Sequence, residues 1–108
     1  MKRKKVAVLF GGCSKDYEAS LQSAYTVITN LNPQKYKPIL IGITRQGAWL
    51  RYYGPIEKIP NDTWMDGGEC VPVAIPSDRN IHGLLEFHGD GTVMTRIDVA
   101  FPVLYGKL

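Results

Sequence analysis

The stretch KKVAVLFGG, residues 4–12, decides the fold of this chain. From Val6 onward the run is apolar and partly β-branched, and two glycines stop it. A continuous apolar run of this length is typical of a strand buried on both faces, as in a parallel sheet. We therefore expect a first strand over Lys4 to Phe10 that ends at Gly11.

An amphipathic helix is expected to follow this strand. Its apolar residues recur at spacings of three and four, the pattern of a helix packed on a sheet, at Tyr17, Leu21, Ala24, Ile28 and Leu31. Ser14 is the predicted N-cap, and Asp16 and Glu18 place negative charge at the positive end of the helix dipole. The helix should end before Asn32-Pro33.

A second buried strand is predicted over Tyr36 to Ile43 (YKPILIGI). The order strand, helix, strand implies a parallel pair, because parallel neighbours need such a crossover. A short strand over Ala48 to Tyr53 should fold back after the turn at Gln46-Gly47. The segment Gly54 to Gly68 is rich in Pro, Asn, Asp and Gly, so we expect a surface excursion there.

The second half of the chain should add shorter strands. Val71 to Ile75 is one, and Gly83 to His88 with Thr92 to Ile97 should form a hairpin around Gly89-Asp90-Gly91. Ile97 to Leu104 (IDVAFPVL) is again a buried strand, expected to lie parallel beside the first two. The predicted fold is therefore α/β: a Rossmann-like, open, mainly parallel sheet flanked by helices, with a hairpin insertion.

Length and composition exclude several classes of protein. The 108 residues, 44% hydrophobic and 21% charged, suit one compact domain. The net charge of +3 is scattered apart from Lys2 to Lys5, so no nucleic-acid partner is expected. No apolar run approaches the roughly 20 residues that cross a bilayer, so no membrane partner is expected.

The amino terminus imitates an export signal. Basic residues precede the apolar stretch Val6 to Phe10, and Cys13 follows it where a lipoprotein would be acylated. The apolar stretch is shorter than the roughly 7 to 15 residues that an export signal needs. We therefore interpret it as a buried strand and expect a cytoplasmic protein.

The junction between the first strand and the helix, Gly11 to Glu18, is the most informative part for function. Ligands of open α/β sheets collect at the carboxyl ends of strands, and glycines there allow close backbone approach. Asp16 and Glu18 suit a cationic group such as an amine. The alternative is that they only counter the helix dipole. A second strand end of this kind leads into Tyr105 to Lys107.

Other kinds of site find little support in the sequence. Neither the G-x-G-x-x-G fingerprint nor the Walker pattern occurs, which argues against a nicotinamide or P-loop site. Cys13 lies near a helix start, but no His is close in sequence, so a spectator thiol is the better interpretation. His82 and His88 have no third candidate ligand nearby, so no metal site is predicted.

Together these pieces resemble the D-alanine:D-alanine ligase family, and within it the vancomycin-resistance D-alanyl-D-serine ligases more closely. The resemblance covers most of the chain in the expected order and is weak only from Asp66 to Thr95. The matching stretches are VAVLFGGCSKDYEASLQSA (6–24), KYKPILIGITRQGAW (35–49), NDTW (61–64) and DVAFPVLYGKL (98–108).

The resemblance implies a role in making the dipeptide precursor of peptidoglycan. Residues 1–108 would be the single amino-terminal, substrate-binding domain of a three-domain ATP-grasp ligase, ending before the ATP-grasp domains. ATP and Mg²⁺ would be held by those other domains, so none is expected on this chain, which would be inactive alone. The substrates would be D-alanine and a second D-amino acid, D-alanine or D-serine, and a homodimer is a further possible arrangement.

The resemblance also assigns roles to residues. Asp16 stands at the carboxylate of the family's G-G-x-S-x-E pattern, implied to hold the ammonium of the first D-alanine, and Ala19 would line the substrate methyl. Tyr105 stands where the family usually has the His of its HG motif. The catalytic candidates are Asp16 and Tyr105, and the substrate-binding candidates are Gly11, Gly12, Ser14, Asp16, Ala19, Tyr105 and Gly106.

Two of these positions depart from the family pattern. Asp for Glu withdraws the carboxylate at position 16 by about 1.5 Å, one carbon-carbon bond. Tyr for His at position 105 replaces a group that titrates near neutrality by a phenol that does not.

Two other functions fit parts of the sequence. A stand-alone Rossmann-like module could bind a small amine or amino acid, or serve as a dimerisation surface, and the fold alone does not separate it from a ligase domain. A flavodoxin-like nucleotide site would need a first loop without acidic neighbours, which Asp16 contradicts.

Overall fold

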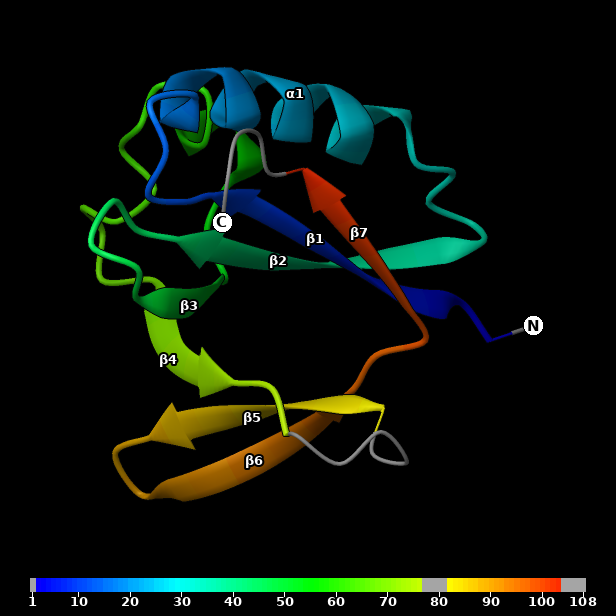
Figure 1. Ribbon diagram of the computed structural model, residues 1–108. Helices are drawn as coiled ribbons and strands as arrows, with labels where there is room; N and C mark the ends of the chain where they lie inside the picture. Colours follow the sequence, from blue (N-terminus) through cyan, green and yellow to red (C-terminus); the bar gives the residue numbers. More distant parts are fainter. Residues whose placement is uncertain (1, 77–81, 104–108) are drawn as a thin grey trace.

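The computed structural model of the protein describes residues 2–76 and 82–103. The described strands form one seven-stranded sheet in the order β6-β5-β4-β3-β2-β1-β7 (Figure 1). In chain order the elements are β1 (Lys4–Gly11), α1 (Tyr17–Asn30), β2 (Tyr36–Ile43), β3 (Trp49–Tyr52), the 3-10 helix η1 (Ile56–Lys58), β4 (Cys70–Ala74), β5 (Gly83–His88), β6 (Gly91–Arg96) and β7 (Val99–Val103).

The predicted parallel pairing of three strands is confirmed, but β7 is not the buried strand that was predicted: it lies at the edge of the sheet and four of its five residues are exposed. β1 pairs in parallel with β2 on one side, where Val6 lies opposite Pro38. It pairs in parallel with β7 on the other side, where Val6 lies opposite Val99. Helix α1 provides the crossover from β1 to β2 that a parallel pair requires. The carboxyl ends of β1, β2 and β7 therefore meet at one edge of the sheet.

The prediction of a mainly parallel sheet is wrong. Only the two pairings of β1 are parallel, and the four pairings from β2 to β6 are antiparallel. The chain leaves β2 through a tight turn, in which Thr44 N donates to Ala48 O at 2.9 Å and Ala48 N donates to Thr44 Oγ1 at 3.0 Å. In the described residues no α-helix connects any two strands after β2, so each strand returns beside its predecessor in the opposite direction.

The expectation of a sheet flanked by helices also needs correction. The described residues contain one α-helix, which lies on one face of the sheet, and the strands β5 and β6 lie on the side away from it (Figure 1). The sheet curls so that Leu84 of β5 and Val73 of β4 cover the second face of β1 and β2. That second core consists of Ala7, Leu9, Ile39, Ile41, Val73 and Leu84.

The segment 54–68 runs over the surface as its composition predicts, but two of its side chains reach into the core. Ile59 and Trp64 are fully buried in the core beneath α1. The indole of Trp64 packs edge-on against Phe10, with ring centroids 5.1 Å apart, and against Tyr52. A Cβ added to Gly42 would lie 2.3 Å from the Trp64 ring, so a glycine in β2 makes room for it. The loop therefore completes the helix-side core.

The remaining short strands lie close to their predicted positions. The hairpin of β5 and β6 turns at Gly89-Asp90, and β3 folds back on β2 as expected. The last strand ends at Val103, and its predicted end at Leu104 lies outside the described residues. In the described part of the chain, no helix is long and apolar enough to cross a membrane.

Candidate functional site

The two glycines after β1 form a junction that other residues would disrupt. Gly11 and Gly12 have φ angles of 89° and 108°, in the left-handed region. A Cβ on Gly11 would lie 2.2 Å from the carbonyl oxygen of Ile43, and Gly12 N donates to that same oxygen at 2.8 Å. The loop therefore crosses closely over the carboxyl end of β2.

The helix begins later than predicted. Tyr17 is its first residue and Asp16, not Ser14, occupies the N-cap position. The hydroxyl of Ser14 accepts a hydrogen bond from Asp16 N at 3.1 Å, which stabilises a turn before the helix and moves the helix start two residues on. The side chain of Asp16 makes no capping hydrogen bond. Its carboxylate is thus not used to begin the helix.

The second acidic residue of the junction is paired. Arg45 Nη2 lies 3.6 Å from Glu18 Oε1 and 3.8 Å from Asp62 Oδ2. Its guanidinium also lies over the ring of Tyr17, 4.1 Å from the centroid. Among the described residues, by contrast, Asp16 forms no ion pair. Of the two carboxylates, only that of Glu18 has a cationic partner among the described residues.

Tyr17 ties the loop 54–68 to the start of α1. Its buried hydroxyl donates to Asp62 Oδ1 at 2.9 Å and accepts from Trp64 Nε1 at 3.2 Å. Burial is the main reason that the pKa of Tyr17 rises to about 12; the hydrogen bond with Trp64 and the charge of Arg45 act to lower this pKa, and Asp62 acts to raise it. The phenol stays neutral at physiological pH, so its role here is to hold the loop in place.

Ser20 connects the ends of three elements. It lies on α1, is fully buried, and accepts a hydrogen bond from Gly11 N at 2.9 Å. It also donates to the carbonyl oxygen of Val103 at the end of β7. One hydroxyl therefore holds together the strand ends from which the first loop and the chain after β7 depart.

The predicted site residues are placed only in part. Gly11, Gly12, Ser14, Asp16 and Ala19 lie together on one loop and the first turn of α1, with Ala19 exposed. Tyr105 and Gly106 lie outside the described residues. The strand that leads to them ends beside the junction, because Val103 lies opposite Phe10.

Sequence reasoning missed the supporting residues of this edge. The available signal for Ser20 is its position: a small polar residue three positions after Tyr17, on the apolar face of the helix, must find partners when buried. No local pattern marks Arg45 or Trp64, because their contacts come from distant segments.

An apolar hollow lies beside the junction between β1 and α1. It has a volume of about 410 Å³ and is lined by Leu9, Gly12, Cys13, Ile43, Gly47, Trp49 and Pro102. Cys13 is an exposed thiol at this hollow, without a His partner. Within the ranges 2–76 and 82–103, no group of three or more His, Cys, Asp or Glu side chains is arranged to hold a metal ion.

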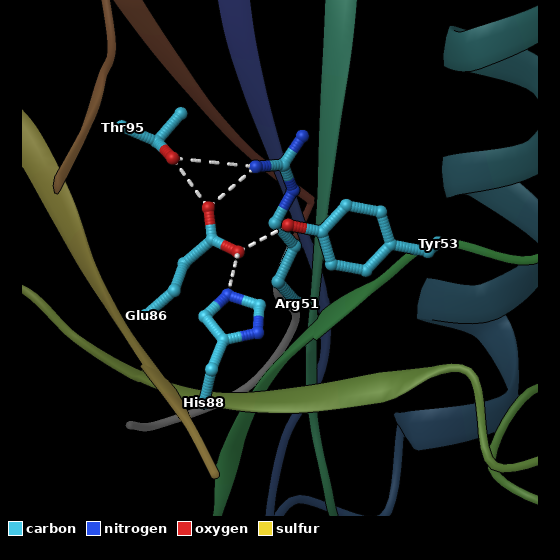
Figure 2. Close-up of polar contacts among 5 residues, drawn as sticks. All are labelled: Arg51, Tyr53, Glu86, His88 and Thr95. Carbon is cyan, nitrogen blue, oxygen red and sulfur yellow. Dashed lines mark hydrogen bonds and ion pairs between the residues drawn. The ribbon is translucent and has the colours of Figure 1, made fainter. Parts of the chain in front are cut away.

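A polar cluster far from the junction surrounds Glu86 (Figure 2). Glu86 is 1% exposed, and its carboxylate pairs with Arg51 Nη1 at 2.5 Å. Tyr53 and Thr95 donate to it through their hydroxyls, and His88 Nε2 lies 3.3 Å from Oε1. The cluster joins β3 to β5 and β6 across the curled face of the sheet.

The charge of Glu86 is stabilised despite its burial. Burial alone would raise the pKa of Glu86, but hydrogen bonds from Thr95, Tyr53 and Arg51, together with the Arg51 charge, lower it to about 2. Both carboxylate oxygens are occupied by these partners. The cluster is therefore suited to fastening the hairpin to the sheet rather than to binding a substrate.

Comparison with known proteins places this domain in a family. Residues 5–108 match the family model described as D-ala D-ala ligase N-terminus. The chain is 42% identical to a D-alanine–D-alanine ligase of Ruminiclostridium cellulolyticum over 113 residues, covering 98% of this chain and 30% of the relative. It is 38% identical to the vancomycin/teicoplanin A-type resistance protein VanA of Enterococcus faecium, over 99% of this chain and 29% of the relative.

A solved structure agrees with these matches. The VanG D-Ala:D-Ser ligase of Enterococcus faecalis superposes with a TM-score of 0.90 at 46% identity, covering 98% of this chain and 30% of that one. The chain belongs to the D-alanine:D-alanine ligase amino-terminal domain family. It spans about 30% of the length of these relatives, and the predicted resemblance to D-alanyl-D-serine ligases is confirmed.

Proposed function

We propose that this chain forms one wall of the first D-alanine site of an ATP-dependent D-alanine:D-amino-acid ligase, which makes a peptidoglycan precursor dipeptide. The second substrate is D-serine or D-alanine. In this proposal the domain positions the first D-alanine, and the chain alone is not catalytic.

The observation that carries the proposal is the state of the Asp16 carboxylate. It lies at the carboxyl edge of the parallel strands, where ligands of open α/β sheets bind, and it caps no helix and forms no ion pair within the described residues. Glu18, two residues further along the chain, is already paired with Arg45. An ammonium group beside Asp16 would gain a charge-assisted hydrogen bond.

Most of the other predicted substrate residues also have a part in this proposal. Gly11 and Gly12 let the loop pass close to the carboxyl ends of the strands, which leaves room above it for a small amino acid. Ala19 presents a methyl group on the first helical turn, suited to contact with the methyl of D-alanine. Tyr105 and Gly106 would complete the wall from the chain after β7, with Tyr105 in the place of the family's His.

The nucleotide belongs elsewhere in this proposal. The sequence has no phosphate-binding glycine motif. ATP and Mg²⁺ would be held by the ATP-grasp domains of the complete ligase. Calorimetric titration of the 108-residue chain should therefore show no ATP binding in the low micromolar range, near −8 kcal/mol.

A chimera tests the proposal directly. Residues 1–108 would replace the corresponding first domain of the Enterococcus faecalis VanG ligase, with which they share 46% identity. The chimera should release phosphate from ATP in the presence of D-alanine and D-serine. In it, Asp16→Asn should lower kcat/KM for the first D-alanine by about one to two orders of magnitude and leave KM for ATP nearly unchanged.

Two variants of the chimera serve as controls. Glu18→Gln removes a charge of the same sign from the same helical turn but from a carboxylate that faces Arg45, so its effect should be several times smaller. Asp16→Glu should retain activity. If Asp16→Asn were kinetically silent, the carboxylate would only offset the helix dipole, and a stand-alone binding or dimerisation module would become the better interpretation.

A further inference from the structure

The pairing of β1 with β7 ends beside the candidate site. Its last pair is Phe10 with Val103, and Gly11 is the next residue of β1. Beyond this pair a side chain joins the two strand ends: Gly11 N donates to Ser20 Oγ at 2.9 Å, and Ser20 Oγ donates to Val103 O. In a parallel ladder, by contrast, backbone groups bond to each other directly. The hydroxyl of Ser20 therefore stands between the two strand ends.

Ser20 is also bound to the residue that carries the proposed substrate contact. Its backbone N–H donates to Asp16 O at 3.0 Å, in the first turn of α1. Its hydroxyl uses its one proton toward Val103 and a lone pair toward Gly11, so the side chain has a fixed orientation. The residue is fully buried, so water cannot readily replace these bonds. One serine thus fixes three backbone segments relative to one another.

We propose that Ser20 is a positioning residue of the D-alanine site. Its hydroxyl sets the separation between the loop that carries Asp16 and the chain that leaves β7 after Val103. This inference rests on the function proposed above and adds the residue that holds the two sides of the site at their working distance. Ser20 itself does not touch the substrate, because its side chain is fully buried. It acts through the backbone of the segments that it binds.

The separation matters because contacts with a small substrate depend strongly on position. A charge-assisted hydrogen bond between an ammonium group and a carboxylate needs its two atoms about 2.7 to 2.9 Å apart. A displacement of about 1 Å at a reacting group can cost about a hundredfold in rate. Ser20→Ala removes both hydrogen bonds between the strand ends, so the loop of Asp16 can shift relative to β7. The loss should fall on the first D-alanine and spare the nucleotide.

Kinetics of the chimera with the Enterococcus faecalis VanG ligase test the inference. With D-serine and ATP saturating, Ser20→Ala should lower kcat/KM for the first D-alanine about tenfold, mainly through a rise in KM. KM for ATP should change by less than about twofold. Ser20→Cys keeps a weak hydrogen-bond donor, so its KM for D-alanine should lie between those of the unsubstituted chimera and Ser20→Ala. Circular dichroism checks that each variant is folded at the assay temperature.

Ile28→Val is the matched control for stability. Ile28 is buried near the other end of α1, and its loss of one methyl group should cost about as much stability as Ser20→Ala without changing KM for D-alanine. If Ile28→Val raises this KM as much as Ser20→Ala does, the effect is one of stability alone and the inference fails. If Ser20→Ala leaves KM unchanged while Asp16→Asn lowers kcat/KM, the inference fails and the proposed function stands. If both Ser20→Ala and Asp16→Asn are silent, the proposed function fails as well.

Discussion

The two halves of the sheet are stabilised in different ways. In the parallel half, β1, β2 and β7 lie beside α1, and every residue from Val6 to Gly11 is buried. In the antiparallel half, β3 to β6, no residue of β6 is buried, and a charged residue, Glu86, is among the most enclosed side chains. The first half is stabilised mainly by apolar packing, and the second combines packing with a network of hydrogen bonds.

This difference matters for function. The candidate site lies at the carboxyl edge of the parallel half, where a rigid apolar core holds the loops in place. Residues 66–95, where the sequence alone showed only a weak resemblance, supply β4, β5 and most of β6, and the ligase family model and the VanG structure match the chain across them as well. The candidate site residues that the structure describes all belong to the parallel half.

The largest effect is expected from the parallel half, in Trp64→Ala. This change removes a fully buried indole that packs against Phe10 and Tyr52, and the free energy of unfolding should fall by about 4 kcal/mol. Denaturant titration measures it. Trp49→Ala, at a partly exposed indole, is the matched control and should cost clearly less. Equal losses at the two positions would contradict the picture of a single apolar core beneath α1.

A smaller effect is expected from the antiparallel half, in Glu86→Gln. The change keeps the shape of the side chain but leaves the guanidinium of Arg51 without its charge partner, so stability near neutral pH should fall by about 2 to 3 kcal/mol. Glu57→Gln, at an exposed position, is the control and should change stability very little. A silent Glu86→Gln would mean that the hairpin is fastened by apolar contacts alone.

The same cluster predicts a dependence of stability on pH. The pKa of Glu86 is about 2 in the folded protein, below the ordinary value of about 4.3 for an unfolded chain. The ionised form therefore stabilises the fold fully above about pH 5, and this contribution is lost as the pH falls toward 2. The stability difference between the unsubstituted chain and Glu86→Gln should shrink over that window, as denaturant titrations at a series of pH values would show. A constant difference would contradict the assignment.

Ser20→Ala should have a more modest effect on stability, about 1.5 kcal/mol. It leaves the N–H of Gly11 and the carbonyl of Val103 without their buried partner. Ser20→Cys keeps a weak hydrogen-bond donor of similar shape, so its stability should lie between that of the unsubstituted chain and that of Ser20→Ala. Denaturant titration again measures the loss. If Ser20→Ala were neutral, the serine would not hold the ends of β1 and β7 together.

The smallest effect on stability is expected for Asp16→Asn, within about 0.5 kcal/mol. The side chain makes no capping hydrogen bond and, in the described part of the chain, no ion pair. A large loss of stability would show that the carboxylate has a structural role, and the proposed contact with D-alanine would lose its main support. Thermal unfolding of the unsubstituted chain and of Asp16→Asn in the same buffer measures the difference in stability.

Local patterns in the sequence determined much of the fold. The apolar run of β1, the glycine junction, the stripe of α1 and the YKPILIGI run of β2 each act within a few residues, so periodicity and turn chemistry sufficed to predict them. The same is true of the turn at Gly89-Asp90. The sequence placed Asp16 at the junction after β1, although within the helix after a Ser14 cap, whereas Asp16 itself occupies the N-cap position.

Only the tertiary structure decided how distant segments meet. Trp64 comes from a stretch with loop composition, yet it completes the core because Gly42 leaves space for its ring. Ser20 binds Val103, 83 positions away, and Arg51 binds Glu86, 35 positions away. The antiparallel pairings of β4 with β3 and β5, which make the sheet mostly antiparallel, were not predicted, since a short apolar strand carries no mark of its partner. Sequence patterns report local conformation and burial, whereas pairing depends on the free energy of the whole assembled sheet.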